Sequence, residues 1–347
     1  MLLEERKATE VAYLSNNKPT IAIVGGSGYI GSWTAYKMLE SYNVRVIDIK
    51  DPPERIKDHV EFMKTDVREY EALKKALDGV DVVIYTAIIQ IPQINEQKQL
   101  AYEVNILGLQ NACRIVDESD TAKALILSGS WHVFGEHGIE GVIREDFGLR
   151  PDKVEPRARL YAINKIGQET IVRIYDEMSE KIFGIIRMGT VLGEGMPEKT
   201  AANIFIERGI RGETLTPYKH SMYRPMLYVD VLDIAKAFKA FVDRVFSGDI
   251  KKDNKGSLSH IVNVVWHEPI TIYDLAVIIK SLIEKHTNGK ISPEIEIVDT
   301  GQPMVYNEDD KKKLRVDTTK VKELLGIEKL ASPEEVLERL IIARLKK

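Results

Sequence analysis

A short apolar segment followed at once by three spaced glycines constrains this chain more than any other feature. Residues 20–32 read TIAIVGGSGYIGS, and the apolar part predicts a short buried strand, with a helix over 33–39. In such a strand–turn–helix, Gly25 allows the tight turn, Gly28 lets backbone approach a pyrophosphate, and Gly31 lets the helix pack closely. The helix N-terminus then faces the phosphates. The stretch therefore predicts a dinucleotide-binding site.

A carboxylate at the end of the next predicted strand supports this interpretation. Residues 44–49 read VRVIDI, and Asp48 stands about twenty residues past the glycines, where a carboxylate accepts both ribose hydroxyls. The same charge repels a 2′-phosphate, which favours NAD over NADP. Arg45 and Lys50 are close in the sequence, so NADP stays open at this point.

Composition excludes several other classes of protein. The chain has 347 residues, enough for one large α/β unit or two lobes. Its formal net charge of −4 implies no basic face, so we expect no nucleic-acid partner. A single cysteine, Cys113, excludes an internal disulfide framework or a cysteine metal cluster, and the histidine spacing predicts no metal site. Without a long apolar run or a secretory signal, we expect a cytoplasmic protein without membrane contact.

Beyond residue 50, predicted strands and helices alternate along the chain. Such alternation implies right-handed βαβ units and a doubly wound parallel sheet, which is an α/β fold. The predicted strands are 60–63, 80–86, 124–127, 182–186 and 260–265. The predicted helices are 69–77, 95–117, one that begins near 159, and 228–242.

Tyr161 and Lys165 form a Tyr-x-x-x-Lys pair on one predicted helix. Side chains four residues apart on a helix are neighbours, and an ammonium beside a phenol favours the phenolate. The pair could bring a group with an ordinary pKa of about 10 toward the range of a general base. Ser130 follows a predicted parallel strand, where open α/β sheets place their active sites, and its hydroxyl can hold the substrate oxygen.

With these residues in this order, the chain resembles the extended short-chain dehydrogenase/reductase family, in its nucleotide-sugar epimerase and dehydratase group. The resemblance runs from about residue 18 to the C-terminal part of the chain. Its motifs are GGSGYIGS (25–32), VIDI (46–49), DV (66–67), YTA (85–87), VNILGLQN (104–111), LSGSWHVFG (127–135), YAINK (161–165), RMGTVLG (187–193), RPMLYVDVLDIAKAF (224–238) and DTTKVKELLGI (317–327).

The resemblance implies a role for each matched position. Tyr161 would be the acid/base, Lys165 would bind the nicotinamide ribose and tune Tyr161, and Ser130 would hold the reacting hydroxyl. Arg224 would pair with a substrate diphosphate. The implied NAD-binding residues are Gly25, Ser27, Gly28, Tyr29, Ile30, Gly31, Asp48, Asp66, Val67, Thr86, Ala87, Asn105, Ser128, Tyr161, Lys165 and Met188. The implied substrate-binding residues are Gln90, Ser130, Trp131, His132, Thr190 and Arg224.

Within the family, residues 130–132 point to one reaction. The dehydratases of this group have a sequence similar to Thr-Asp-Glu at these positions, whereas this chain has Ser130, Trp131 and His132. The missing carboxylates argue against dehydration and against the related decarboxylation. What remains is 4-epimerisation of a nucleotide sugar, in which one carbon is oxidised and then reduced on its other face. His132 could be a second acid/base, a substrate contact or a packed histidine.

Some departures from the family pattern keep other functions open. Thr190 replaces an asparagine that contacts the diphosphate in many relatives, and KHSMYR (219–224) replaces a Gly-Asp-Gly-Arg pattern. PMLYVD (225–230) also resembles short-chain L-threonine dehydrogenases, which carry out a net oxidation. A non-catalytic NAD(H)-binding regulator is a third possibility. GETLTPY (212–218) resembles the segment that binds the nucleotide base and favours a nucleotide sugar.

The resemblance also predicts the organisation of the chain. We expect an N-terminal arm over 1–18, a Rossmann dinucleotide domain over 19–187 and 224–268, and a smaller interleaved substrate lobe over 188–223 and 269–347. The substrate should lie between the two lobes. Helices matching 95–117 and 160–177 pair across a two-fold axis in the family, so we expect a homodimer.

Overall fold

The computed structural model describes residues 18–252 and 258–346. The arm predicted over 1–18 therefore falls outside the described residues, apart from Lys18. In the described ranges, no helix combines the length and apolarity that a membrane span requires.

Contacts divide the chain into two compact units. The first unit contains Met1–Gly129, Leu160–Ile186 and Ala235–Val262, and the second contains Ser130–Arg159, Arg187–Ile234 and Asn263–Lys347. Residues 130–159 thus pack with the second unit, whereas the sequence placed them in the dinucleotide domain. The reason is strand pairing, because β6 (Gly141–Ile143) pairs in parallel with β13 (Leu314–Val316).

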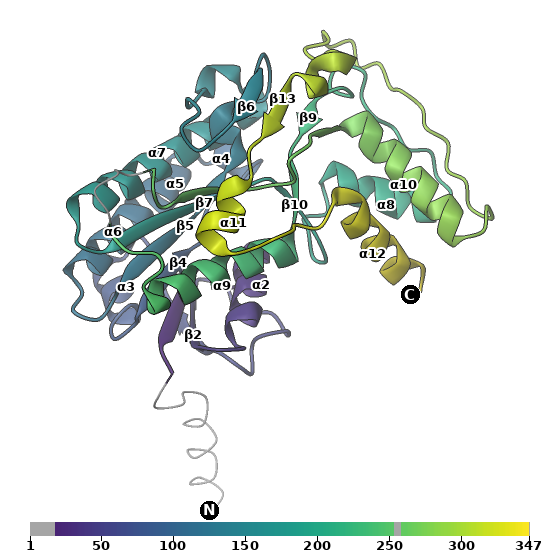
Figure 1. Cartoon of the computed structure of the whole chain (residues 1–347). Coiled ribbons are helices and arrows are strands. Elements are labelled where there is room, and N and C mark those ends of the chain that lie inside the picture. The colour runs from purple at the N-terminus through teal and green to yellow at the C-terminus, as the bar shows by residue number, and fades with distance from the viewer. Residues whose placement is uncertain (1–17, 253–257, 347) are drawn as a thin grey trace, which may run out of the picture. The chain divides into compact units, whose positions relative to one another are not determined.

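A seven-stranded parallel sheet forms the centre of the first unit (Figure 1). Its strands lie in the order β11-β7-β5-β4-β1-β2-β3. They are β1 (Thr20–Val24), β2 (Asn43–Asp48), β3 (Glu61–Lys64), β4 (Val82–Tyr85), β5 (Ala124–Ser130), β7 (Ile182–Met188) and β11 (Ile261–Val264). The order reverses between β1 and β4, and open α/β sheets bind ligands at the carboxyl end of such a switch point. The predicted doubly wound sheet is confirmed.

Helices cover both faces of this sheet. They are α2 (Tyr29–Met38), α3 (Tyr70–Ala76), α4 (Gln93–Glu96), α5 (Lys98–Tyr102), α6 (Gly108–Glu118), α7 (Pro156–Met178) and α9 (Val231–Ser247). Leu73 of α3, Leu109 of α6 and Val172 of α7 share one buried cluster with alternate residues of the strands. On the opposite face, Phe241 of α9 packs against Gly184, while α2 contacts β1 and β2. The near-continuous burial of β1, β4 and β5 follows from this double cover.

The structure corrects several predicted element bounds. The helix predicted over 95–117 is interrupted once, at Gln97 between α4 and α5, and from Lys98 it runs without a break through α5, a π-helical turn η1 (Glu103–Leu107) and α6. Helix α7 begins at Pro156 instead of near 159, since proline is tolerated in a first helical turn. The helix predicted over 228–242 begins only at Val231, because 228–230 form strand β10.

Three helices that pack on one another and three strand pairs are the main elements described in the second unit. Helices α8 (Ala201–Ile210), α10 (Ile272–His286) and α12 (Pro333–Leu345) pack on one another. Besides the β6–β13 pair, β8 (Thr190–Leu192) pairs with β10 (Tyr228–Asp230), and β9 (Pro225–Met226) pairs with β12 (Ile270–Thr271). The remaining short elements are η2 (Trp131–Phe134), η3 (Pro151–Lys153), η4 (Glu308–Lys312) and α11 (Thr319–Leu325).

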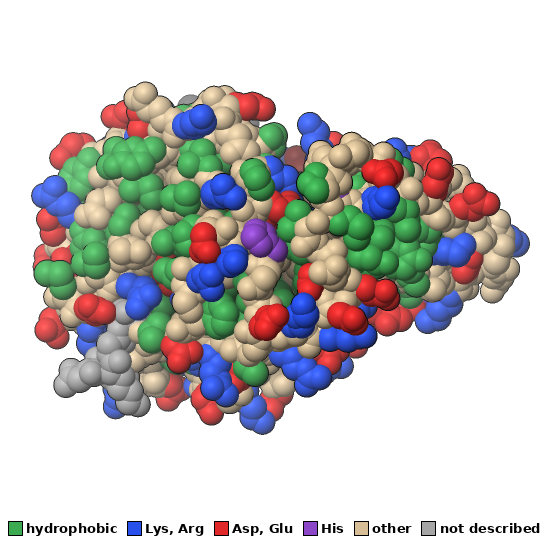
Figure 2. All heavy atoms as spheres, turned by 90° about the horizontal axis from the view of Figure 1, so that it is seen from above, with side chains coloured by type: hydrophobic (Ala, Val, Ile, Leu, Met, Phe, Trp, Pro, Cys, Tyr) green, Lys and Arg blue, Asp and Glu red, His purple; other side chains and the backbone are tan. Residues whose placement is uncertain are grey.

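Charged side chains of both signs are interspersed on the molecular face that Figure 2 shows. Hydrophobic side chains lie between them in patches, and this face carries no continuous area of Lys and Arg. The mixed pattern agrees with the small net charge of the whole sequence.

Candidate functional site

The glycine loop joins the carboxyl end of β1 to the start of α2. Gly25 has φ +81°, and a Cβ built there would lie 2.4 Å from the main-chain nitrogen of Ala87. A Cβ at Gly31 would lie 2.3 Å from the carbonyl oxygen of Gly25. Gly28 is the N-cap of α2 and provides no capping side chain. The glycines therefore bring the helix start against the ends of β1 and β4, which leaves backbone to meet a ligand at the switch point.

Asp48 is held rigidly at the end of β2. Its Oδ2 accepts the main-chain N–H of Ser27 at 3.0 Å, and its Oδ1 accepts that of Lys50 at 3.0 Å. The hydroxyl of Ser27 donates to the Lys50 carbonyl at 2.7 Å. These bonds tie the carboxylate to the glycine loop, and each carboxylate oxygen keeps a lone pair that can accept a ribose hydroxyl. The cradle and the carboxylate fit a dinucleotide such as NAD.

Further predicted cofactor residues lie at other strand ends of the first unit. Asp66 and Val67 follow β3, where Arg68 binds the Asp66 carboxylate at 2.7 Å. Thr86 and Ala87 follow β4, and the Thr86 hydroxyl donates to the carbonyl oxygens of Val24 at 2.9 Å and Gly25 at 3.0 Å. These contacts lock the end of β4 to the glycine loop.

Asn105, an implied NAD-binding residue, makes several hydrogen bonds within the first unit. It is fully buried in the π-helical turn, where its Oδ1 accepts the N–H of Ile89 at 2.7 Å. Its Nδ2 donates to the Ile89 carbonyl at 3.2 Å and to Oδ1 of Asn164 at 3.3 Å. Gln168 in turn donates to the Asn105 carbonyl at 2.8 Å. Asn105 thus joins the segment after β4 to helix α7, and π turns of this kind recur at functional sites.

Helix α7 carries Tyr161 and Lys165 one turn apart. Lys165 is buried, and its ammonium donates to the carbonyl oxygen of Ser128 at 2.7 Å. Burial lowers the pKa of Lys165 to about 7, because a charged amine loses its hydration there. Tyr161 is half-buried. The lysine is therefore anchored to the end of β5 on the helix that presents the phenol.

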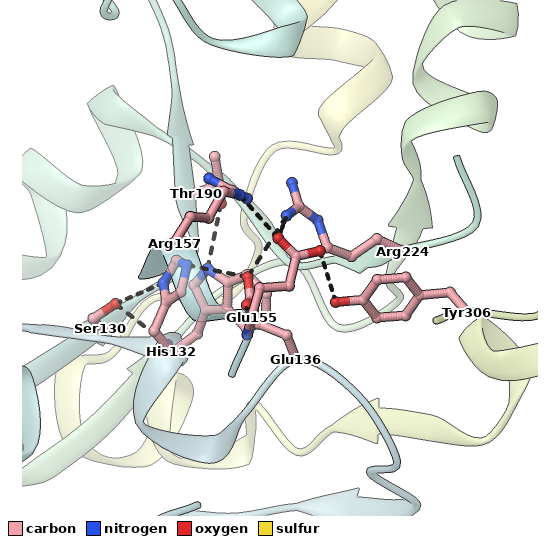
Figure 3. A network of polar contacts seen from close by, with 9 residues as sticks. Ser130, His132, Glu136, Glu155, Arg157, Thr190, Arg224 and Tyr306 are labelled. Atoms are coloured by element: carbon pink, nitrogen blue, oxygen red, sulfur yellow. Dashed lines mark hydrogen bonds and ion pairs between the residues drawn. The ribbon is translucent and has the colours of Figure 1, made fainter. Parts of the chain in front are cut away.

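In the second unit, Ser130 and His132 contact each other twice. Oγ of Ser130 lies 3.2 Å from Nδ1 of His132 and accepts the main-chain N–H of His132 at 3.3 Å, which caps the short helix η2. On the other side of the ring, Nε2 lies 3.5 Å from Oε1 of Glu136. The order serine–imidazole–carboxylate is visible in Figure 3. It resembles the arrangement in which a carboxylate orients a histidine that accepts the proton of a hydroxyl group.

Glu136 is a fully buried carboxylate. Burial by itself would raise its pKa, but the hydrogen bond and charge of His132, the charge of Arg224 and the main-chain N–H of Glu155 outweigh burial. They hold the pKa of Glu136 at about 2. The group is therefore ionised at neutral pH.

Arg224 is bound by glutamates of its own unit. Its Nη1 donates to Oε2 of Glu155 at 2.8 Å and lies 3.8 Å from Oε1 of Glu136. Tyr306 donates to Oε1 of Glu155 at 3.0 Å, and Arg157 donates to Oε2 at 2.9 Å. Figure 3 shows the Glu155 carboxylate between Arg224 and Tyr306. The guanidinium that the sequence assigned to a substrate diphosphate is thus already paired and is only 11% exposed.

Trp131, Thr190 and Gln90 are the other predicted substrate residues, and Met188 is the last of the implied NAD-binding residues. Trp131 is buried, and its indole N–H donates to Oγ1 of Thr190 at 3.3 Å, so these two residues pair with each other. Met188 is buried at the end of β7. Gln90 is exposed in the first unit, after β4.

A comparison with sequence models of known protein families identifies the family of this chain. The family model described as "NAD dependent epimerase/dehydratase family" matches residues 21–255. The chain belongs to this family. The resemblance inferred from the motifs is confirmed, and so is NAD as the cofactor of the family.

Curated relatives of this epimerase/dehydratase family member differ in their reactions. The proposed UDP-glucose 4-epimerase of Methanocaldococcus jannaschii is 26% identical over 272 residues, which are 75% of this chain and 81% of that protein. Cinnamoyl-CoA reductase 1 of Petunia hybrida is 26% identical over 232 residues, which are 62% of this chain and 67% of that protein. Family membership therefore leaves the substrate open.

Solved structures show the same fold. The UDP-glucose 4-epimerase of Thermus thermophilus, solved in complex with NAD, has a TM-score of 0.72 and 20% identity. The superposition covers 93% of this family member and 98% of that chain. At this identity the likeness establishes the architecture, and function rests on the residues of the site.

Sequence reasoning missed three residues of the second unit that belong to the polar network of Figure 3: Glu136, Glu155 and Tyr306. A signal existed for Glu136, because it stands four residues after His132 in WHVFGE. No local pattern marks Glu155 or Tyr306, which meet across 151 positions of the chain.

The buried lysine predicts a pH-dependent stability. Between pH 7 and about 10.4, the ordinary pKa of lysine, the unfolded chain binds a proton at Lys165 that the native chain does not. The contribution of Lys165 to the free energy of unfolding therefore rises with pH across that window, by up to about 1.4 kcal/mol per pH unit. We expect the free energy of unfolding of the wild type, relative to Lys165→Met, to increase from pH 7 to 10 in urea titrations without NAD.

A matched control is Lys75→Met, which removes an exposed lysine from α3. Its stability difference from the wild type is expected to stay flat over the same range. Parallel curves for the wild type and the Lys165 variant would contradict the lowered pKa.

Proposed function

We propose that this chain is an NAD-dependent epimerase that inverts C4 of a nucleotide-diphosphate sugar. The observation that carries the proposal is the position of Lys165. This residue is buried on helix α7, which also carries Tyr161, and its amine donates to the main-chain carbonyl of Ser128 at the end of β5. This arrangement suits a single acid/base that works beside an oxidised nicotinamide. An epimerase needs only one such group, because the same carbon is oxidised and then reduced.

In this mechanism the chain's own residues handle the proton of one hydroxyl. Bound NAD supplies the acceptor, and later the donor, of a hydride. Tyr161 removes the hydroxyl proton as hydride leaves the carbon and returns it when hydride comes back. When it is protonated, which without NAD is the case below its pKa of about 7, Lys165 favours the phenolate form of Tyr161, and Ser130 hydrogen-bonds the reacting oxygen. The glycine loop and Asp48 hold the dinucleotide.

The surroundings of Ser130 argue against water elimination. Residues 131 and 132 carry no carboxyl group. Glu136 is near His132, but its pKa of about 2 leaves no proton to donate at neutral pH. Neither residues 131 and 132 nor Glu136 therefore supply the additional acid that a dehydratase would need.

A second candidate is a net dehydrogenase of a small hydroxy compound, such as L-threonine. The pairing of Arg224 with Glu155 favours it, because a diphosphate would have to displace a partly buried carboxylate from the guanidinium. A small substrate without phosphates makes no such demand. A non-catalytic NAD(H)-binding regulator would have no use for the set of Ser130, Tyr161 and Lys165.

One experiment separates these functions. Purified protein with NAD is incubated with UDP-glucose, UDP-galactose, their N-acetyl and uronic forms, and L-threonine, while products are followed by NMR and NADH by absorbance. We expect one UDP-sugar to yield its 4-epimer without net NADH. Stoichiometric NADH from one substrate would instead establish the dehydrogenase and overturn the epimerase proposal.

We also propose that the protein acts in the cytoplasm as a homodimer through its α5–α6 and α7 segments. These segments expose large apolar side chains in the first unit, which supports a second copy as the occupant. They are Tyr102, Leu107, Ile163, Ile174 and Met178.

A further inference from the structure

Glu155 gathers three hydrogen-bond donors of the second unit on one carboxylate. Its Oε2 accepts from Nη1 of Arg224 at 2.8 Å and from Nε of Arg157 at 2.9 Å. Its Oε1 accepts from the hydroxyl of Tyr306 at 3.0 Å. Figure 3 shows these donors converging on Glu155. The carboxylate therefore has two partners, Arg157 and Tyr306, besides the guanidinium that the sequence assigned to a substrate diphosphate.

Arg224 is only partly satisfied by this pairing. Nη1 of its guanidinium bonds Glu155 and lies 3.8 Å from Oε1 of Glu136, which is too far for a hydrogen bond. Within the described residues, Nε of Arg224 is buried and has no hydrogen-bond partner. A phosphate group has several oxygens and can accept from two N–H groups of one guanidinium at once. An anion of this kind would therefore satisfy Arg224 better than the single oxygen of Glu155 does.

A substrate anion and Glu155 would compete for Arg224. The arginine side chain is only 11% exposed, and two negative groups on one poorly hydrated guanidinium repel each other. The carboxylate would therefore leave Arg224 when such an anion binds. It would not be left unpaired, because Arg157 is two residues further along the chain and its side chain is 54% exposed. Arg157 thus has room to follow the carboxylate.

We propose that Glu155 is a specificity-determining residue, which occupies Arg224 until an anion with several oxygens displaces it. The proposal rests on the proposed function in naming the diphosphate of a nucleotide sugar as that anion. The displaced carboxylate stays with Arg157 and Tyr306, so the exchange replaces one ion pair by another and moves no proton. A ligand without an anionic group cannot replace the carboxylate and gains nothing at Arg224.

Glu155→Gln removes the competing charge and keeps an amide oxygen that can still accept from Tyr306. Arg224 then lacks its closest counter-ion, so an added anion should bind to it more strongly. We expect inorganic pyrophosphate to bind this variant roughly tenfold more tightly than the wild type, about the worth of one hydrogen bond to a charged group. Calorimetry on the full chain measures the affinity, with saturating NAD present so that the glycine loop is occupied.

Glu140→Gln is the matched control, because it removes the same charge from a side chain of the second unit that is 71% exposed. It should change the affinity for pyrophosphate less than about twofold, since exposed charges interact weakly. In the Arg224→Met background, Glu155→Gln should also have little effect, because the carboxylate acts through the arginine. An equal gain in that background, or no gain in the folded Glu155→Gln protein, would overturn the proposal.

A measurement on the wild type covers the case in which Glu155→Gln does not fold. NMR of the full chain labelled with ¹⁵N-arginine reports the Nε–H groups of the guanidiniums, and Arg224→Met identifies the signal of Arg224. With NAD present, added pyrophosphate should shift this signal, because the anion replaces Glu155 as the partner of the guanidinium. An Arg224 signal that does not respond to pyrophosphate would overturn the proposal, whatever the substrate is.

The outcomes separate the exchange at Arg224 from the proposed function. With a UDP-sugar that turns over, Glu155→Gln should lower KM without raising kcat, since Glu155 affects binding and not the reacting atoms. If Glu155→Gln tightens pyrophosphate binding and no UDP-sugar turns over, the exchange stands and the nucleotide-sugar function is in doubt. If a UDP-sugar turns over and pyrophosphate binding is insensitive to Glu155→Gln, the exchange is wrong and the function stands.

Discussion

Replacing Tyr161 with phenylalanine is expected to lower turnover roughly 10²- to 10⁴-fold, the usual contribution of a general acid–base group. The phenol hydroxyl is the only group removed, and the glycine loop, Asp48 and Lys165 remain to hold NAD. Affinity for NAD, measured by fluorescence or calorimetry, should therefore stay within about twofold of the wild type. Turnover is measured with the substrate that gives a product in the UDP-sugar and L-threonine panel.

Tyr175→Phe is the matched control for this loss. Tyr175 lies on the same helix α7, and its hydroxyl accepts a hydrogen bond from Gln110 at 2.8 Å. We expect this variant to keep its turnover, because the hydroxyl serves packing between α7 and α6. Full activity in Tyr161→Phe would show that another group carries the proton and that the proposed mechanism is wrong.

Gly25→Ala is expected to lower the free energy of unfolding by about 3 kcal/mol and to weaken NAD binding at least tenfold. The added Cβ would lie 2.4 Å from the nitrogen of Ala87, in backbone that cannot move aside without shifting β4. The left-handed φ of +81° adds strain to the same residue. Urea unfolding gives the stability, and an NAD titration gives the affinity.

Gly79→Ala is the control that separates the cost of a left-handed backbone from the cost of the close contact between residue 25 and Ala87. Gly79 has φ +69°, but a Cβ there would meet no atom within 4 Å. This variant should lose only about 1 kcal/mol, the cost of the left-handed conformation, and bind NAD normally. Equal losses in the two variants would mean that the approach of Gly25 to the end of β4 has no special role.

The sequence predicted most of the first unit because its signals are local. The glycine spacing, the run of apolar strands and Asp48 each lie within a few residues of the feature that they mark, and all are in the predicted places. The long helix predicted over 95–117 is present from Lys98 to Glu118, but its π turn was not predicted, for a tertiary reason. Asn105 exchanges hydrogen bonds with Ile89 and donates to Asn164, and nothing in the helical spacing of 95–117 reveals those partners.

The second unit was predicted less well, because its contacts join distant parts of the chain. Arg224 was recognised by position, but its partner Glu155 is 69 residues away and belongs to a loop without a motif. Residues 130–159 belong to the second unit through the pairing of β6 with β13, two strands of three residues each. A strand of that length has too few residues for an alternation of apolar and polar side chains to be recognised in the sequence.

The π turn before α6 limits how this region can change in length. A π turn holds one residue more than a regular helix would, so removing a residue from 103–107 would restore an α-helix. The helical turns on either side would keep their register, because the π turn absorbs that extra residue. A deletion elsewhere in 98–118 would instead rotate the residues before it by about 100° relative to those after it. Single-residue deletions should therefore be tolerated better within 103–107 than elsewhere in this helix, and an alignment with a relative whose helix is regular would carry its one-residue gap at this turn.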